Sequence, residues 1–312
     1  MASFRLNLIT NPDVNAPEDF EQLAELIQTY DNEISAVVCR DEAPLEQDAL
    51  HLPAWTFSPA PLRWFCPARG QIHQGLLLPK SAEYERLESI GIPIPSWALL
   101  TARSRPDCAS MGPYVVVKPD FGAQGADVRI ARTSRLRWYH PTTRLARLLG
   151  GLFAPYIVQT FVYTGPWPIS YRVTTLFGEA LWCHKVEASH ERPALNGRYG
   201  FAQLGSGKSA SIVSSGKGCT YELENDPDII NLAERAHRAF PEIGLLGVDL
   251  LRDVESGQLF VSEVNSLGYT WHFSSPSGRA YQQQFGLSLE SQFDGRRKAA
   301  RILAEQTRRL AC

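Results

Sequence analysis

The sequence predicts an α+β protein of mixed α/β character, with a small N-terminal α/β domain followed by two α+β subdomains. Three observations support this prediction. The chain of 312 residues is too long for one small core. A strand–helix–strand pattern opens it, and a region rich in strands and turns follows. We therefore expect three units, at residues 1–78, 79–160 and 161–312.

The N-terminal unit begins with a strand, FRLNLIT, at residues 4–10, and a second strand, ISAVVCR, follows at residues 34–40. Between them, four apolar residues recur at helical spacing: Phe20, Leu23, Leu26 and Ile27. This pattern predicts a strand–helix–strand layer. The proline-rich stretch from Leu52 to Pro67 has no clear period, and we assign it to a connection.

The second unit opens with a helix at Lys80, which Gly91 ends just before a pair of prolines. Residues 114–118 form a continuous apolar strand, residues 122–125 a loop with two glycines, and residues 127–131 a strand of alternating polarity. This order predicts a β-hairpin with a glycine-rich tip.

A strand at residues 156–162 crosses from the second unit into the third, and four more strands are predicted in the third unit, at residues 171–177, 179–187, 245–251 and 258–264. Glycine and serine accumulate at residues 192–218, which predicts a long mobile loop. Two helices are expected, at residues 226–240 and 294–310. The first has an N-cap aspartate followed by proline, and the second carries apolar residues against a solvated cationic face.

Composition and charge exclude several classes of protein. Apolar residues make up 44% of the chain and charged residues 21%, as in folded globular proteins. A formal net charge of -2 provides no basic footprint, so we expect no nucleic-acid partner. No apolar stretch has the length of a membrane span, and the six cysteines lack the close spacing of zinc or redox motifs. We expect a cytoplasmic protein with reduced thiols and no membrane partner, and the sequence leaves a homodimer open.

Two acidic residues flank a predicted hairpin near the end of the chain. Asp249 and Glu263 lie on its two strands, and Ser256, midway between them, falls in the turn. Regular pairing would place the carboxylates opposite each other, with about 5 Å between the Cβ atoms. Strand alternation predicts one common face for four residues: Leu259, Val261, Glu263 and Asn265. Two carboxylates and an amide on a half-buried face suit Mg2+, although surface carboxylates beside a turn would give the same pattern.

The segment VVVKPDFGAQG combines a buried-looking strand, a lysine at its end and a glycine-rich tip. Glycines let backbone N–H groups approach a phosphate closely, and Lys118 supplies a fixed positive charge. Anion binding is one interpretation. The other is a hairpin whose glycines only satisfy turn geometry and whose lysine faces solvent.

Taken in order, these elements resemble the ATP-grasp superfamily, and in particular D-alanine–D-alanine ligases and glutamate-adding ligases. The matching motifs are the lysine before GIPIP, then VVVKP, GAQGADV, YIVQTFV, SYRV, GVDLL and SEVN. The resemblance implies an ATP site formed by Lys80, Lys118, Gly122, Gln124, Gly125, Gln159, Thr160, Phe161, Arg172 and Lys185. It also implies three Mg2+ ligands: Asp249, Glu263 and Asn265. For Lys185, an exposed strand lysine is the alternative.

The same resemblance implies a fold in which two α+β subdomains sandwich ATP, and a ligase reaction. A substrate carboxylate would attack the γ-phosphate, and an amine or similar nucleophile would capture the acylphosphate, releasing ADP and phosphate. Arg172 and Lys118 are then the expected catalytic residues, because they neutralise charge on the transferring phosphoryl group together with Lys80 and Mg2+. The partners would be a small-molecule carboxylate and an amine. A small-molecule kinase and a non-catalytic ATP-binding regulatory protein are the alternatives.

The chain departs from the family pattern at two places. Ser170 stands where glutamate-adding relatives carry an acid two residues before the arginine. After Asn265 the sequence continues as SLGYTWHFSS, and four of its side chains are candidates for recognising an acceptor: Tyr269, Trp271, His272 and Ser274. For His272, a hydrogen-bonded structural histidine is the alternative.

One motif is a decoy. GSGKS at residues 205–209 ends like a P-loop, but Ala202 occupies the position of the required first glycine and no helical pattern follows. We interpret this region as a lid, from which Arg198, Lys208 or Lys217 could close over phosphate or substrate.

Overall fold

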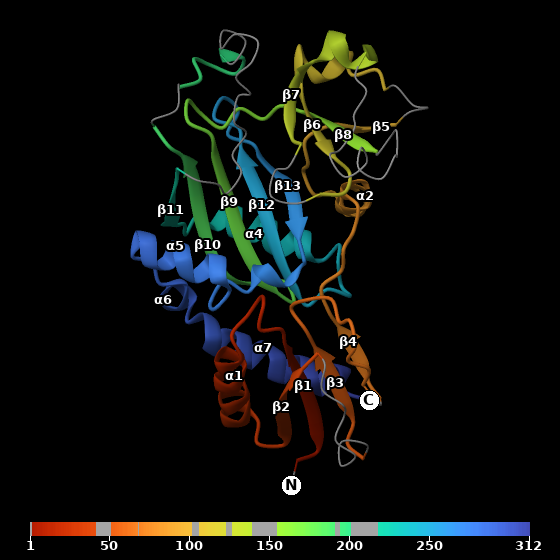
Figure 1. Cartoon of the computed structure of the whole chain (residues 1–312), viewed down its shortest axis with the longest axis vertical. Helices are drawn as coiled ribbons and strands as arrows, with labels where there is room; N and C mark the ends of the chain where they lie inside the picture. The colour runs from red at the N-terminus through yellow and green to blue at the C-terminus, as the bar shows by residue number, and fades with distance from the viewer. Residues whose placement is uncertain are drawn as a thin grey trace.

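The computed structural model describes residues 2–41, 51–67, 69–101, 106–122, 127–138, 155–190, 194–200 and 218–312. These residues form three β-sheets that follow one another along the long axis of the molecule (Figure 1). The predicted mixed α+β class is confirmed. The predicted loop at residues 192–218 and its P-loop-like motif lie mostly outside the described residues.

The N-terminal sheet is parallel, with the strand order β2-β1-β3-β4. Its elements are β1 (Phe4–Thr10), α1 (Pro17–Tyr30), β2 (Ile34–Arg40), β3 (Ala54–Phe57) and β4 (Gln71–His73). The two predicted strands and the helix between them are confirmed. The assignment of residues 52–67 to a connection is wrong, because β3 lies inside this stretch with all four residues buried. Prolines on both sides of so short a strand hide it from periodicity.

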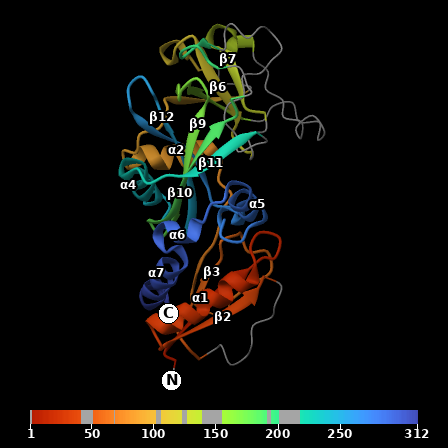
Figure 2. The ribbon, with the colours of Figure 1, turned by 90° about the vertical axis from the view of Figure 1, so that its left-hand side faces the viewer.

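The last helix, α7 (Gly295–Leu310), returns to this sheet and packs beside α1 (Figure 2). Its Ile302 and Leu303 are buried, while Arg308 forms an ion pair with Asp31 after α1. The terminal backbone of Cys312 also exchanges two hydrogen bonds with Ala54 in β3. The helix predicted in the third unit therefore packs on the N-terminal one.

The central sheet is antiparallel and has five strands in the order β11-β10-β9-β12-β13. Their bounds are Ile169–Leu176 for β9, Glu179–Ala188 for β10, Cys219–Leu223 for β11, Leu245–Arg252 for β12 and Leu259–Asn265 for β13. Helix α4 (Pro227–His237) covers one face, and the Asp226 side chain caps it by accepting from the Asp228 backbone N–H at 2.8 Å. The other face meets the segment after β13 and helix α5 (Pro276–Phe285), and α6 (Leu289–Phe293) follows.

The third sheet is also antiparallel, with the order β5-β8-β6-β7. Its strands are β5 (Trp97–Leu100), β6 (Tyr114–Pro119), β7 (Arg129–Arg132) and β8 (Tyr156–Thr160). The predicted hairpin is the β6–β7 pair. Helix α2 (Lys80–Ser89) lies beside this sheet, at the level where it meets the central one (Figure 1).

Three apolar cores hold the sheets together. One combines the N-terminal sheet, α7 and part of the central sheet, a second lies between the central sheet and α4, and a small third one fills the β5–β8 sheet. Phe177 joins the first two sheets: it occupies the left-handed region at φ 47° in the β9–β10 turn, and its ring contacts Trp55 and Phe57. None of the described helices is both long and apolar enough to span a bilayer.

Candidate active site

Two lysines from different elements are brought to one place. Lys80 is the first residue of α2 and Lys118 lies near the end of β6; both are largely buried. Asp120 ties the two elements together, since its carboxylate accepts from the backbone N–H of Ser81 at 2.8 Å and from the Ser81 hydroxyl at 3.1 Å. Pro79 at the N-cap offers no side-chain acceptor, so Asp120 caps α2 from a distance. The cap joins the residue after Lys80 to a residue two positions after Lys118, and it therefore holds the two lysines close to each other.

The ammonium of Lys80 lies between the glycine hairpin and the predicted metal site. It donates to the Gly122 carbonyl at 2.7 Å and forms an ion pair with Glu263 at 3.2 Å. A cation in this place can contact a phosphate and a metal-bound carboxylate together. Gln124 and Gly125, the other predicted residues of the hairpin tip, lie outside the described residues.

The ammonium of Lys118 is held by two acceptors. It donates to the Tyr84 hydroxyl at 2.8 Å and to the Ser262 carbonyl at 2.9 Å. Burial lowers the pKa of Lys118, and nearby carboxylates, Glu263 first, oppose this effect. A lysine has three N–H donors, so one donor remains beyond these two acceptors of the described chain.

Asp249 and Glu263 lie opposite each other on β12 and β13, as predicted. Both side chains are partly exposed, at 20% and 29%. Their strands run antiparallel in the central sheet, and the pair faces away from α4, since Val248 and Leu250 on either side of Asp249 are in the core with that helix. The two carboxylates therefore share one open face.

A β-bulge changes the predicted alternation along β13. Leu250 pairs with Val261 rather than with Ser262, so Ser262 is the extra residue. As a result Val261 and Val264 both point into the core against α4. The prediction of one common face is wrong for half of its members: the bulge separates Leu259 and Val261 from Glu263 and Asn265.

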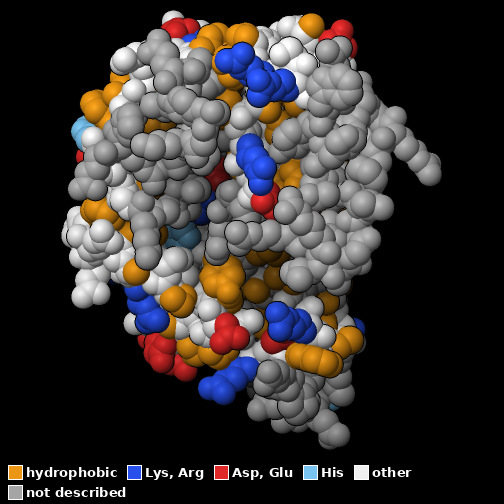
Figure 3. Space-filling model, turned by 45° about the horizontal axis from the view of Figure 1, so that its top comes forward, with side chains coloured by type: hydrophobic (Ala, Val, Ile, Leu, Met, Phe, Trp, Pro, Cys, Tyr) orange, Lys and Arg blue, Asp and Glu red, His pale blue; other side chains and the backbone are white. Residues whose placement is uncertain are grey.

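Arg172 lies on β9, directly opposite Asp249 of β12. Its guanidinium donates two hydrogen bonds of 2.6 Å to the two carboxylate oxygens, and the Asn265 amide donates to one of them at 2.9 Å. The structure thus places the predicted phosphate arginine and all three predicted metal ligands within one connected cluster. Acidic, basic and histidine side chains gather in a hollow near the middle of this face of the molecule (Figure 3).

The donor set fits a hard cation only with help from a ligand. Asp249, Glu263 and Asn265 offer carboxylate and amide oxygens, which Mg2+ prefers. In the described part of the chain, no group of three or more His, Cys, Asp or Glu side chains could hold a metal ion by itself. Mg2+ keeps several waters and usually binds through one or two carboxylates plus substrate phosphates. The cluster suits that mode of binding.

The predicted adenine strand is β8. Gln159 is buried in its middle, paired with Trp97 on one side and Val116 on the other, and its side-chain oxygen accepts from the Tyr84 hydroxyl at 2.8 Å. The Thr160 N–H donates to the Ser96 carbonyl at 2.8 Å. A small hollow of about 230 Å3 opens beside the end of this strand, lined by Thr160, Phe161, Val162 and Phe260 among others. Adenine binding by these residues stays a prediction.

Two predicted cations lie elsewhere. Lys185 lies two residues after Cys183, which packs toward α4, so strand alternation places both side chains on the same face. This face is opposite the one that carries Arg172. The Lys185 ammonium pairs with Glu222 at 2.7 Å. The Glu222 hydrogen bond raises the pKa of Lys185. The alternative interpretation, a strand lysine with no phosphate role, fits this position. In this structure Arg198 binds the β12–β13 turn, through Asp253 at 2.8 Å, and its closure over a phosphate stays a prediction.

The acceptor candidates after β13 are mostly engaged in packing. The Trp271 indole N–H donates to Asp19 of α1 at 3.1 Å, and the Ser274 hydroxyl accepts from the Ala16 N–H at 3.0 Å. Both contacts attach this segment to the N-terminal domain. One of the aromatic residues predicted to contact an acceptor, Trp271, therefore attaches the segment to the N-terminal domain instead.

His272 fits its structural alternative. It is buried, and its Nδ1 lies 2.8 Å from the Tyr281 hydroxyl of α5. Burial, and then the charge of Arg172, lower the pKa of His272 well below its ordinary value, so the ring is neutral. Of the four candidates only Tyr269 is exposed, at 56%.

Sequence reasoning missed three residues of this site: Glu83, Tyr84 and Asp120. Asp120 sits in the KPD motif, where an acid two residues after a predicted phosphate lysine was a usable signal. Glu83 is 7% exposed, and its Oε2 has no hydrogen-bond partner among the described groups. Burial raises the pKa of Glu83 to about 8, with Lys80 opposing. Nothing in the sequence distinguishes Glu83 and Tyr84 from other residues of α2.

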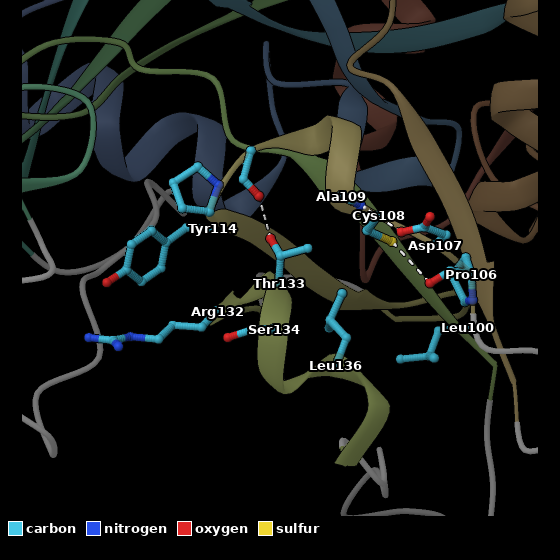
Figure 4. A pocket seen from close by; sticks show the side chains of 12 residues that line it. Leu100, Pro106, Asp107, Cys108, Ala109, Tyr114, Arg132, Thr133, Ser134 and Leu136 are labelled. Carbon is cyan, nitrogen blue, oxygen red and sulfur yellow. Dashed lines mark hydrogen bonds between the residues drawn. The ribbon is translucent and has the colours of Figure 1, made fainter.

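A larger hollow lies away from these residues, in the β5–β8 sheet (Figure 4). Its volume is about 930 Å3, and Leu100, Cys108, Tyr114, Arg132 and Leu136 are among its lining residues. Thr133 donates to the Gly112 carbonyl at its edge. None of the predicted site residues lines this hollow, so its size says nothing about the lysine and carboxylate cluster.

The comparison with known families agrees with this arrangement. Residues 79–267 match the ATP-grasp domain. This span covers more than half of the chain, and the chain belongs to the ATP-grasp family. The resemblance inferred from the motifs is confirmed. No curated protein matches the chain.

Solved structures share the fold at low identity. D-cycloserine synthetase DcsG is 19% identical with a TM-score of 0.51, over 97% of this chain and 99% of that chain. The ATP-grasp ligase PsnB, complexed with a minimal precursor, is 14% identical with a TM-score of 0.54, over 98% and 100%. A RimK domain ATP-grasp protein from Sphaerobacter thermophilus is 14% identical with a TM-score of 0.52, over 97% and 99%. Another PsnB structure contains the precursor, Mg and ADP. At these identities the likeness shows the fold alone.

Proposed function

We propose that the protein is an ATP-dependent ligase that joins a small-molecule carboxylate to an amine through an acylphosphate, releasing ADP and phosphate. One observation carries the proposal: Lys80 joins the glycine hairpin to Glu263, within the cluster that also contains Arg172, Asp249 and Asn265. ATP-grasp ligases among the structural neighbours support it. The proposal takes the cytoplasm, where ATP is available, as its location.

The residues of the cluster would act mainly by binding charge. Lys80 and Lys118 would hold phosphate oxygens, since both ammonium groups lie at the junction of the hairpin and β13. When bound, Mg2+ would neutralise phosphate charge and act as a Lewis acid, with Asp249, Glu263 and Asn265 as its protein ligands. No side-chain nucleophile is required.

Arg172 would contribute to phosphoryl transfer through its position beside the metal ligands. A guanidinium that already binds Asp249 through two donors is held in a fixed orientation. It retains further N–H donors for a phosphoryl oxygen, because an arginine carries five. Charge that spreads over the transferring group would meet this preorganised donor without reorientation.

The proposal is tested by ATP-dependent phosphate release with pooled carboxylates and amines. We expect release that requires both an acid and an amine. Glu263→Gln should abolish it, and the matched control Glu305→Gln, an exposed acid on α7 that pairs with Arg301, should leave it unchanged. Unchanged turnover in Glu263→Gln would refute the metal assignment.

The same assay separates the two alternatives. A kinase would yield ADP and a phosphorylated alcohol without free phosphate. A regulatory protein would bind ATP tightly with no turnover across the panel. Either result would replace the ligase proposal.

A further inference from the structure

We propose that Tyr84, a residue with no charge and no predicted role, is a positioning residue of the nucleotide site. Its hydroxyl would set the Lys118 ammonium and the bulge of β13 relative to each other. The inference rests on the proposed function, in which Lys118 binds ATP phosphates. It is carried by contacts that converge on one buried oxygen atom.

The Tyr84 hydroxyl lies where four elements meet. It belongs to α2, accepts from Lys118 of β6 at 2.8 Å, and lies 2.6 Å from the Ser262 carbonyl of β13 and 2.8 Å from Oε1 of Gln159 in β8. A hydroxyl has one proton, which these two oxygens share as acceptors, and a lone pair for the ammonium. The oxygen is therefore fully engaged.

These contacts are shielded from water. Tyr84 is 0% exposed, Gln159 4% and Lys118 6%. Hydrogen bonds in such surroundings are stronger than in solvent, and a missing partner cannot be replaced by water. The ring also supports the ammonium, whose nitrogen lies 5.0 Å from the ring centroid. Removal of the hydroxyl would leave Lys118 with one acceptor, the Ser262 carbonyl, among the described contacts.

The bulge gives this arrangement a second consequence. Ser262, whose carbonyl Tyr84 and Lys118 share, immediately precedes Glu263. Glu83, the residue before Tyr84, is buried as well, and helix α2 packs against β13. Helix α2 thus holds the backbone directly before the predicted metal ligand. Helix α2 would then fix the distance from the phosphate lysine to the metal carboxylate.

The direct test is binding of Mg·ATP to the full chain, measured by titration calorimetry. Tyr84→Phe removes the hydroxyl and keeps the ring. We expect the affinity for Mg·ATP to fall by about tenfold or more, which is the loss typical of a hydrogen bond to a charged group. The matched control is Tyr281→Phe, which removes a buried hydroxyl that binds His272, and we expect its affinity to stay within about twofold of the unmodified chain.

A double-mutant cycle shows whether Tyr84 acts through Lys118. Lys118→Met alone should weaken Mg·ATP binding, and adding Tyr84→Phe should then weaken it no further. Additive losses, or unchanged affinity in Tyr84→Phe, would overturn the inference. A purely structural role would lower the melting temperature without such coupling.

Failure of the proposed function differs from failure of the Tyr84 role. If the unmodified chain does not bind Mg·ATP, the proposed function is wrong. If the unmodified chain binds Mg·ATP and Tyr84→Phe binds it equally well, only the role of Tyr84 is wrong. Folding of each variant is checked by near-UV circular dichroism. Should Tyr84→Phe unfold, 4-fluorophenylalanine at position 84 fills the space of the hydroxyl, and wild-type affinity in that variant would overturn the inference.

Discussion

Arg172 and Asp249 face each other across β9 and β12 and are joined by two hydrogen bonds of 2.6 Å. The Asp249 carboxylate thus accepts from Arg172 and from the Asn265 amide, and it is also a predicted metal ligand. The pair is only 22% and 20% exposed, so it is weakly screened by solvent. Two of the predictions below depend on this shared carboxylate.

The first prediction concerns the shape of the Arg172 guanidinium. Arg172→Lys keeps the charge but cannot form the bidentate contact, so we expect about a 100-fold loss of kcat. The free energy of unfolding should fall by only about 1–2 kcal/mol, because one of two charge-assisted hydrogen bonds is retained. Steady-state kinetics and urea denaturation measure the two effects. Arg301→Lys in the surface pair with Glu305 is the control, and equal kcat losses in both variants would contradict the prediction.

The second prediction concerns Mg2+. Asp249→Asn removes the charge that a metal requires, and its single amide oxygen can accept from only one of the two Arg172 N–H groups, while its NH2 group faces the other. We expect the Mg2+ concentration for half-maximal ATP binding to rise by about tenfold or more, and the free energy of unfolding to fall by about 1–2 kcal/mol because one charge-assisted hydrogen bond is lost. Titration of Mg2+ at constant ATP measures this shift. Identical Mg2+ curves for the variant and the unmodified chain would place the metal elsewhere.

The strands that could be predicted are those whose signal is local. β1 alternates apolar and polar residues, β2 and β6 contain apolar runs, and the Asp249–Glu263 pairing follows from a short turn between two predicted strands. The short strands β4 and β5, by contrast, present no period to detect. The bulge at Ser262 shows in FVSEVN only as a break in the alternation, where two polar residues stand between Val261 and Val264.

Long-range contacts account for the rest of the site. Asp120 caps a helix that begins 40 positions earlier in the chain, and Tyr84 meets Ser262 across a sequence separation of 178. Neither pairing is encoded in spacing. Lys185 is a different case, since the resemblance implied a place near the phosphates, whereas its strand parity directs it to Glu222.

The third prediction concerns the Asp120 cap. Ser81→Ala removes one hydrogen bond to this carboxylate, and Asp120→Ala removes both side-chain bonds and leaves the first turn of α2 uncapped. We expect the free energy of unfolding to fall by about 0.5–1 kcal/mol for the first change and about 1–2 kcal/mol for the second. ATP affinity should fall only in Asp120→Ala, because Lys80 then loses its fixed place. Urea denaturation and calorimetry check both, and a larger loss in Ser81→Ala would contradict the assignment.

The last prediction concerns acid stability. His237 is buried between the Thr175 hydroxyl at 2.7 Å and the Ile243 carbonyl at 2.9 Å, and burial lowers the pKa of His237 to about 4. Burial, and then Arg172, lower the pKa of His184 to about 3. In the unfolded chain both rings bind a proton near pH 6.5. Their contribution to stability is therefore complete above pH 6.5 and is lost as the pH falls through that value toward 4.

For His237 the loss amounts to roughly 3 kcal/mol once the pH reaches 4. Urea denaturation at a series of pH values measures it as a slope of the unfolding free energy between pH 6.5 and 4. His237→Gln, which keeps a donor and an acceptor without a titrating ring, should reduce that slope. The exposed His190, which pairs with Glu187, provides the control His190→Gln, whose slope should match the unmodified chain. If His237→Gln leaves the slope unchanged, the acid sensitivity arises from other groups and the neutral state assigned to His237 is wrong.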